Sequence, residues 1–393
     1  MRLLNSLGRM PLYCATLAAG LSAAGAASAA DQGVSDDSIT IGMHSSLSGP
    51  IAVFGLAYEW AAQLVIDEVN KTGGVNGRKI ELVVEDDRGD PGAGVAAVTK
   101  LMNRDEAFLI YGGPYTPVAL ATYPRVIEND MIYWSPASST PGLTDPFKKL
   151  TFQAQLTLDD QAIPVTKLAP SMKPKKIAFI GERSEYGTIT REATKAQLAD
   201  RGLDIALDLT IEPDALSATA QVAQIREAGA DVIIHGGTPR VLAFIIRELY
   251  KQEVKAPLIS FGGGSSAAIF ELVRGEAPIE YYAVSPLACR LGEPCTADFM
   301  QKWKAAYGDE APIVWAAQGY AATKLFVAGL KAAGRDLTQD SLIKAYETMA
   351  PFETPELPYP LKFTAENHRA VRGGYLEGYR DGKPFFFGDT AKQ

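Results

Sequence analysis

The residues of this chain best suited to binding a ligand are serines, threonines and glycines that follow apolar runs of sequence. The apolar run 108–111 is followed by two glycines, by a Thr-Pro pair at 116–117, and by a predicted helix. The segment 231–249, DVIIHGGTPRVLAFIIREL, repeats this order. Threonine is a good N-cap and proline suits the first helical turn, so each Thr-Pro pair predicts a helix N-terminus. Such an end carries free N–H groups and about half a positive charge, which suits a carboxylate.

A hydroxyl-rich loop follows the next apolar run, 131–134. It contains Ser135, Ser138, Ser139 and Thr140 in the sequence SPASST. The carboxyl ends of parallel strands meet at one edge of a sheet, so this loop is predicted to lie beside the first Thr-Pro pair. Two such edges facing one another would form a cleft that holds a polar ligand by hydrogen bonds.

The sequence offers no acid–base pair to convert such a ligand. It has no G-x-S-x-G elbow, no H-E-x-x-H motif and no phosphate loop, and its three histidines, His44, His235 and His368, stand in unrelated contexts. His235 ends an apolar run beside Gly236, where a packed or solvated position is favoured and a position facing the cleft is the alternative. Asp86 and Asp87 are adjacent and would point to opposite faces of a strand, which favours a loop or capping role. We therefore expect a receptor rather than an enzyme, with no cofactor and no metal.

Composition and the N-terminus predict an exported globular protein. The chain has 393 residues, 47% hydrophobic and 21% charged, which suits two domains. Segment 1–29 has two arginines, no acid, an Ala/Leu run and the sequence Ala27-Ser28-Ala29 at its end. We interpret it as a signal peptide that is cleaved near Ala29, although a membrane anchor is the alternative.

The net charge bears on the possible partners, and the cysteines bear on a possible disulfide. Loss of the two arginines with the signal would take the net charge from −8 to −10, and no basic stripe remains, so a nucleic-acid partner is not expected. Of the three cysteines, Cys14 leaves with the signal. Cys289 and Cys295 are close in sequence and suggest a small disulfide loop, with two free thiols as the alternative.

Strands alternate with helices along most of the chain, which predicts an α/β fold with a parallel sheet in each of two lobes. Segments 150–158 and 281–288 are expected to be strands that cross between the lobes. The first lobe is predicted to comprise 30–157 and 286–358, and the second lobe 158–285 and 359–393. Several crossings of this kind imply a hinge.

Particular sequence segments resemble the periplasmic leucine/isoleucine/valine-binding protein family, which serves ABC importers. They are ITIGMHSSLSGPIAVFG, VNKTGGVNGRKIEL, DDRGDP, SPASSTPGLT and IGERSEYG, spread over the first half of the mature chain, and the likeness extends over essentially all of it. The resemblance implies two Rossmann-like lobes joined by a three-crossing hinge that closes on a small-molecule ligand, as in a type I periplasmic binding protein. It also implies a periplasmic monomer whose partners are the membrane subunits of an ABC permease.

The resemblance also implies a ligand site with contributions from both lobes. Phe54 and Tyr186 match aromatics that cover the ligand from the first and the second lobe, with core packing as the alternative. Ser139 matches the hydroxyl that completes a carboxylate clamp. The remaining matched positions lie in the loops that follow the strands: Tyr115 and Thr116 at the turn that holds the carboxylate, Ala137 and Ser138 beside Ser139, and Thr238 near the ligand's ammonium. Gly262 and Gly263, in the loop after 257–261, are added to the predicted site because they stand where the family's usual acid is absent.

One departure from the family pattern leaves the ligand open. Amino-acid binders of this type place an acid after the strand that corresponds to 257–261, but this chain has FGGGSSAA there. A buried ammonium without a counter-charge is costly, so either Glu182 or Glu185 supplies the charge or the ligand lacks an amine. Gly262 and Gly263 would also leave space for a bulkier ligand. The candidates are an amino acid, an amine-free aliphatic or aromatic carboxylate, and an amide. An exported sensor and, less favoured, a secreted hydrolase are the rival functions.

Overall fold

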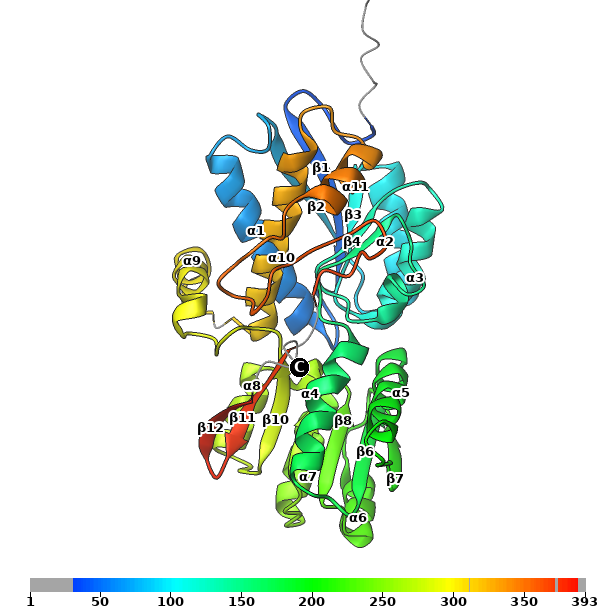
Figure 1. The fold of residues 1–393 in the computed structure, drawn as a ribbon, viewed down its shortest axis with the longest axis vertical. Helices are drawn as coiled ribbons and strands as arrows, with labels where there is room; N and C mark the ends of the chain where they lie inside the picture. Colours follow the sequence, from blue (N-terminus) through cyan, green and yellow to red (C-terminus); the bar gives the residue numbers. More distant parts are fainter. Residues whose placement is uncertain (1–30, 311, 372–373, 388–393) are drawn as a thin grey trace, which may run out of the picture.

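The computed structural model describes residues 31–310, 312–371 and 374–387, and these form two α/β lobes joined end to end (Figure 1). The expected signal peptide and its cleavage site lie outside the described residues. Among the described helices, none combines the length and the apolar character needed to span a bilayer. The first lobe is the upper one in Figure 1 and the second lobe the lower one.

The first lobe is built on a parallel sheet, as predicted. In the described part of the chain its strand order is β2-β1-β3-β4-β5. The strands are β1 (Ser38–Ser45), β2 (Lys79–Asp86), β3 (Leu109–Tyr111), β4 (Tyr133–Ser135) and β5 (Thr151–Gln153). Helices cover both faces of the sheet: α1 (Ala52–Lys71), α10 (Val314–Ala333) and α11 (Gln339–Thr348) on one side, α2 (Pro91–Asn103) and α3 (Thr116–Ile127) on the other. Helix α9 (Ala297–Tyr307) packs on the outer side of α1.

The second lobe has a mixed sheet, which departs from the purely parallel prediction. Among the described residues its strand order is β12-β11-β10-β9-β8-β6-β7. The strands are β6 (Ile177–Glu182), β7 (Leu207–Ile211), β8 (Val232–Gly236), β9 (Leu258–Ser260), β10 (Tyr281–Ser285), β11 (Tyr375–Arg380) and β12 (Lys383–Phe387). Helices α4 (Leu158–Ser171) and α5 (Glu185–Ala199) cover one face, and α6 (Thr219–Ala228), α7 (Pro239–Lys251) and α8 (Ala267–Arg274) the other.

The antiparallel pairs of the second sheet arise from a tight hairpin. Strands β11 and β12 are joined by Asp381 and Gly382, which have φ values of 52° and 68°. Two residues with positive φ suit the two-residue turns that link antiparallel strands, and Asp-Gly is a favoured pair for them. The hairpin then adds to β10, so the C-terminal strands run against the rest of the sheet.

The path of the chain between the lobes corrects two sequence-based boundaries. Segment 150–158 was expected to be a crossing strand, but β5 pairs with β4 inside the first sheet and the crossing follows it. Segment 359–371 was expected in the second lobe, but it packs on the first. The centre of the Phe363 ring lies 5.1 Å from that of Phe152, and the backbone of Arg369 forms an isolated β-bridge with that of Gln153. The apolar residues of this segment cover the edge of the first sheet beside β5. The final crossing therefore comes after Val371 rather than at 358.

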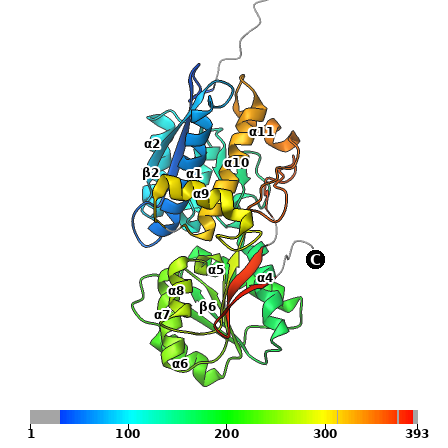
Figure 2. The same cartoon turned by 90° about the vertical axis from the view of Figure 1, so that its left-hand side faces the viewer.

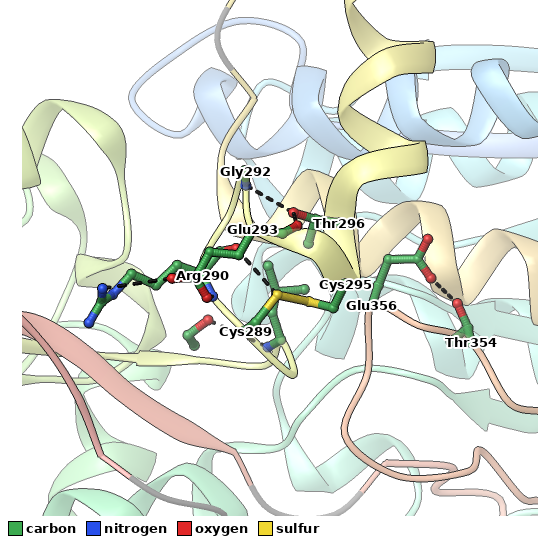
Figure 3. The surroundings of a disulfide bond; sticks show 10 residues. Cys289, Arg290, Gly292, Glu293, Cys295, Thr296, Thr354 and Glu356 are labelled. Atoms are coloured by element: carbon green, nitrogen blue, oxygen red, sulfur yellow. Dashed lines mark hydrogen bonds and ion pairs between the residues drawn. A yellow bond between two sulfur atoms is a disulfide. The ribbon is translucent and has the colours of Figure 1, made fainter.

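A disulfide closes a short loop in the second crossing. The Sγ atoms of Cys289 and Cys295 are 2.08 Å apart (Figure 3). Inside the loop, the Gly292 N–H donates to the Thr296 hydroxyl at 2.9 Å, just before α9 of the first lobe. The guanidinium of Arg290 lies 5.7 Å from the Phe386 ring of β12, in the second lobe. The loop thus contacts the second lobe through Arg290 and leads directly into α9 of the first lobe, a connection that Figure 2 shows beside the hairpin.

Candidate ligand-binding site

A pocket lies between the two lobes, where the carboxyl ends of their parallel strands face each other. The space between its lining residues is about 530 Å³, a figure that includes open solvent at its mouth. Among the described residues, none of those that line it is charged. The first lobe and the crossing after β5 contribute Ile51, Phe54, Tyr58, Pro114, Tyr115, Ala137, Ser139, Gln155 and Trp315; the second lobe contributes Gln161, Tyr186, Gly237, Thr238, Gly262 and Gly263.

The structure brings most of the sequence-predicted site residues together at this pocket. The ones that line it are Phe54, Tyr115, Ala137, Ser139, Tyr186, Thr238, Gly262 and Gly263. Thr116 and Ser138 do not line it but are buried beside residues that do. Their hydroxyl oxygens have no hydrogen-bond partner within the described residues. Eight of the ten predicted residues therefore line the pocket, and the other two, Thr116 and Ser138, are buried next to lining residues.

Four polar or aromatic residues of the pocket wall escaped the sequence analysis. Tyr58 of α1 donates to the Gln318 side chain at 3.0 Å and accepts from Gln155, which fixes two of the four in one hydrogen-bonded group. Gln161 of α4 accepts from the Gly262 N–H at 2.9 Å. Trp315 is the fourth. Tyr58 and Trp315 stand in helices among apolar residues with the spacing of a core, and Gln155 and Gln161 belong to no motif, so nothing in the sequence marks the four as pocket residues.

The edge of the pocket in the first lobe is the N-terminus of α3. Tyr115 is the N-cap and Thr116 the first helical residue, so the helix begins one residue earlier than a Thr116 cap would require. Such shifts of one residue are common at helix ends. The chain direction nevertheless agrees with the prediction: the free N–H groups of the first turn open toward the pocket side, where Tyr115 and Ser139 line the wall.

A buried polar cluster holds the loops of this edge in place. The Asp87 carboxylate accepts from the Ser46 hydroxyl, from the Gly89 N–H at 2.9 Å and, at 2.9 Å, pairs with His44 Nδ1. His44 Nε2 lies 3.0 Å from the Tyr133 hydroxyl. Burial alone would raise the pKa of Asp87, but these hydrogen bonds and the His44 ring lower it below its usual value. Asp87 thus has the loop role that its sequence position suggested.

The edge of the pocket in the second lobe is formed by the ends of β6 and β8. Thr238 is the N-cap of α7, and both its N–H (3.0 Å) and its hydroxyl (2.7 Å) donate to Glu182 Oε2. The Tyr186 hydroxyl accepts from the Gly263 N–H at 3.1 Å. His235 is packed inside the sheet beside Ser260, and burial lowers its pKa to about 3, so the ring is neutral. A neutral ring there agrees with the packing role expected for it.

Trp315 joins the two lobes directly across the pocket. It lies at the start of α10 in the first lobe, and its indole N–H donates to the Gly262 carbonyl in the second lobe at 2.8 Å. A Cβ at Gly262 would lie 2.3 Å from Trp315 Cζ2, and one at Gly263 would lie 2.3 Å from the Gly237 carbonyl oxygen. The expectation that these glycines leave room for a bulkier ligand is therefore wrong, because an indole and a neighbouring backbone already occupy that room.

A family model described as "Periplasmic binding protein" matches residues 38–383 of the chain. The chain belongs to the periplasmic binding protein family. A relative of this binding protein, a Leu/Ile/Val-binding protein homolog from Brucella melitensis, is 26% identical over 317 residues, which are 80% of this chain and 85% of that one.

Solved structures agree with the family. A type 1 periplasmic binding protein from Bordetella pertussis is 25% identical with a TM-score of 0.79, covering 89% of this chain and 99% of that chain. A fatty acid ABC transporter substrate-binding protein from Thermomonospora curvata is 24% identical with a TM-score of 0.81, covering 91% and 93%, and shares the fold. This binding protein is thus of type I, a solute-binding receptor of the ABC-transporter class and not an enzyme.

The contact between the lobes gives a test of closure in this binding protein. Gly262→Ala is expected to weaken ligand binding by about 1–3 kcal/mol, because its Cβ would overpack Trp315 when the lobes meet. In a hinged protein that opens without ligand, the clash with Trp315 arises only on closure. The other near neighbour, Gln161 Oε1 at 3.0 Å within the second lobe, is the end of a flexible side chain that can shift, so the unliganded melting temperature should fall only slightly. Titration calorimetry and thermal melting measure the two quantities.

Gly263→Ala is the matched control for this test. Its Cβ would press on the Gly237 carbonyl within the second lobe, so it should lower the melting temperature of the unliganded protein. Equal melting losses in both variants would show that Gly262 acts on the stability of the second lobe and not on closure.

Proposed function

We propose that this binding protein is exported to the periplasm, captures a small carboxylate-bearing solute by hinge closure, and delivers it to the membrane subunits of an ABC importer. The observation that carries the proposal is the meeting of Ser139 with the α3 N-terminus at one wall of a pocket whose described lining has no charged side chain. Hydroxyls and free N–H groups at a helix N-terminus stabilise a negative charge without a lysine or arginine.

The rest of the pocket suits an apolar portion of the ligand. Phe54, Tyr58, Trp315 and Ile51 line it from the first lobe, and Tyr186 faces them from the second. Such a wall buries an aliphatic or an aromatic side chain. The candidate solutes are accordingly branched-chain or other amino acids, which the names of the relatives also suggest, and aliphatic or aromatic acids that lack the amine.

A thermal-shift screen of the mature protein tests the proposal. The panel comprises amino acids, their deaminated carboxylates, their amides and aromatic acids. A solute present at a hundredfold its Kd should stabilise the folded protein by about 2.7 kcal/mol, which is a readable rise in melting temperature. A carboxylate should stabilise the protein and its primary amide should not. Stabilisation by amides alone would contradict the carboxylate site.

A further inference from the structure

Four buried polar atoms that lack a hydrogen-bond partner in the described part of the chain gather around the pocket. In the first lobe they are Thr116 Oγ1 and Ser138 Oγ, and in the second lobe Glu182 Oε1 and His235 Nε2. Thr116 and Ser138 each adjoin a residue of the pocket wall. The two sides differ in chemistry: the first lobe offers hydroxyl donors, whereas the second offers a carboxylate oxygen and the nitrogen of a neutral imidazole.

Glu182 lies directly behind the wall of the pocket in the second lobe. It is the last residue of β6 and is fully buried. A Cβ at Gly237, which lines the pocket, would lie 3.2 Å from Glu182 Cβ and 2.8 Å from His235 Nε2. The next lining residue, Thr238, donates to Glu182 Oε2 twice. Glu182 is thus in contact with two residues of the pocket wall, Gly237 beside its Cβ and Thr238 at its carboxylate.

The Glu182 charge has no cation beside it among the described residues. The arginines nearest in sequence or across the loop are engaged elsewhere: Arg183 pairs with Glu212, and Arg240 donates to the Pro213 and Asp214 carbonyls. Thr238 donates two hydrogen bonds to one carboxylate oxygen, but a buried carboxylate without a positive partner remains costly. A positive group placed at the pocket side of Thr238 would remove that cost.

The field of Glu182 extends across the pocket to the first lobe. Burial, with the Glu182 charge as the second cause, raises the pKa of Tyr115 to about 12. Tyr115 lines the opposite wall, so a ligand between the two lobes lies within reach of the same negative charge. Glu185, the other acid considered from the sequence, is exposed in the first turn of α5 and does not share this position.

We propose that Glu182, acting through the Thr238 hydroxyl, supplies the counter-charge for an ammonium group of the ligand. The hydroxyl donates its proton to Glu182, so its oxygen is left to accept from the ammonium. The inference rests on the proposed function and narrows it: the ligand is a zwitterion, with its carboxylate at the α3 edge and its ammonium at the Thr238 edge. The acid that is missing after β9 is thus replaced by one at the end of β6.

Calorimetric titration of the mature protein with matched pairs tests this assignment. The pairs are L-leucine with 4-methylpentanoate and L-phenylalanine with 3-phenylpropanoate, which differ only in the amine. The wild type is expected to bind the better amino acid about 30-fold or more tightly than its deaminated partner, as for a buried charge pair. Glu182→Gln should reduce that preference to about threefold or less. Glu185→Gln, which removes the same charge from an exposed neighbouring position, should leave the preference unchanged.

The outcomes separate the two proposals. Equal or tighter binding of a deaminated acid by the wild type overturns the ammonium site and leaves the carboxylate receptor standing, as does a full preference retained in Glu182→Gln. If no member of any pair binds, and the wider carboxylate panel fails too, the proposed function falls and this inference with it. Should Glu182→Gln fail to fold, Thr238→Val is measured in its place; it removes the relaying hydroxyl, and a retained preference would again overturn the assignment.

Discussion

Replacing Ser139 by alanine together with Thr116 by valine is expected to weaken the binding of a carboxylate solute by about 2–5 kcal/mol. Ser139 lines the pocket, and the buried Thr116 hydroxyl at the start of α3 has no partner among the described residues. Both would donate charge-assisted hydrogen bonds to the carboxylate, which are stronger than neutral ones. Titration calorimetry with the tightest solute from the thermal screen measures the loss.

The folded protein itself should tolerate this double substitution. Thr116→Val removes a hydroxyl that is already buried without a partner, so the melting temperature of the unliganded protein should not fall. Ser171→Ala with Thr348→Val makes the same chemical change at hydroxyls that bond only to their own helices. That control should keep wild-type affinity. Unchanged affinity in the Ser139/Thr116 variant would mean that the carboxylate is held elsewhere.

Asp87→Ala is expected to lower the free energy of unfolding by about 3–5 kcal/mol at pH 7. The substitution leaves the buried His44 ring, the Ser46 hydroxyl and the Gly89 N–H without their acceptor. Urea unfolding measures the loss. Asp86→Ala at the adjacent, more exposed position is the control, with an expected loss of about 1 kcal/mol. Equal losses would show that the buried cluster contributes nothing beyond the loop contacts of Asp86.

The stability difference between the wild type and Asp87→Ala should also depend on pH in a defined direction. The pKa of Asp87 is lower in the folded protein than in the unfolded chain. Its carboxylate therefore contributes stability that is fully present above its unfolded pKa of about 3.9 and is lost as the pH falls through the folded value. The difference in stability between wild type and Asp87→Ala should thus be constant from pH 7 to about 5 and shrink below pH 4. A difference that persisted at pH 3 would contradict the lowered pKa.

Much of the fold could be predicted because alternating strands and helices leave few arrangements of parallel strands. The features that the sequence did not predict are the sheet that β5 joins, the C-terminal hairpin and the lobe to which 359–371 belongs. The three-residue strand β5 looked like part of a longer crossing strand, since alternation alone does not say which sheet a strand joins. The Asp381-Gly382 pair is a strong local sign of a two-residue hairpin turn, and the antiparallel strands follow from it. Segment 359–371 has no regular structure, so only its packing on Phe152 assigns it to the first lobe.

Some residues of the binding site could likewise be predicted from the sequence, and others could not. Residues in the glycine- and hydroxyl-rich loops at strand ends could be placed at a cleft because parallel sheets bring those ends together. Tyr58 and Trp315 could not, because they sit on helices whose spacing is that of buried core. Trp315 reaches the pocket only because the chain returns to the first lobe and starts α10 at the boundary between the lobes. The acid at the end of β6 was one of two candidates, and burial with an unpartnered oxygen distinguishes it from Glu185.

The three crossings have a consequence for the order in which the molecule can be assembled during synthesis. The first sheet is covered by α10 and α11, which are made only after the whole of β6–β10, and the second sheet is completed by β11 and β12 at the very end of the chain. Neither lobe is a contiguous stretch of sequence, so a growing chain cannot finish one lobe while it makes the other. Folding must wait for long-range contacts between distant segments, which slows it. Under the export to the periplasm proposed above, that delay would help the chain to cross the membrane before it folds.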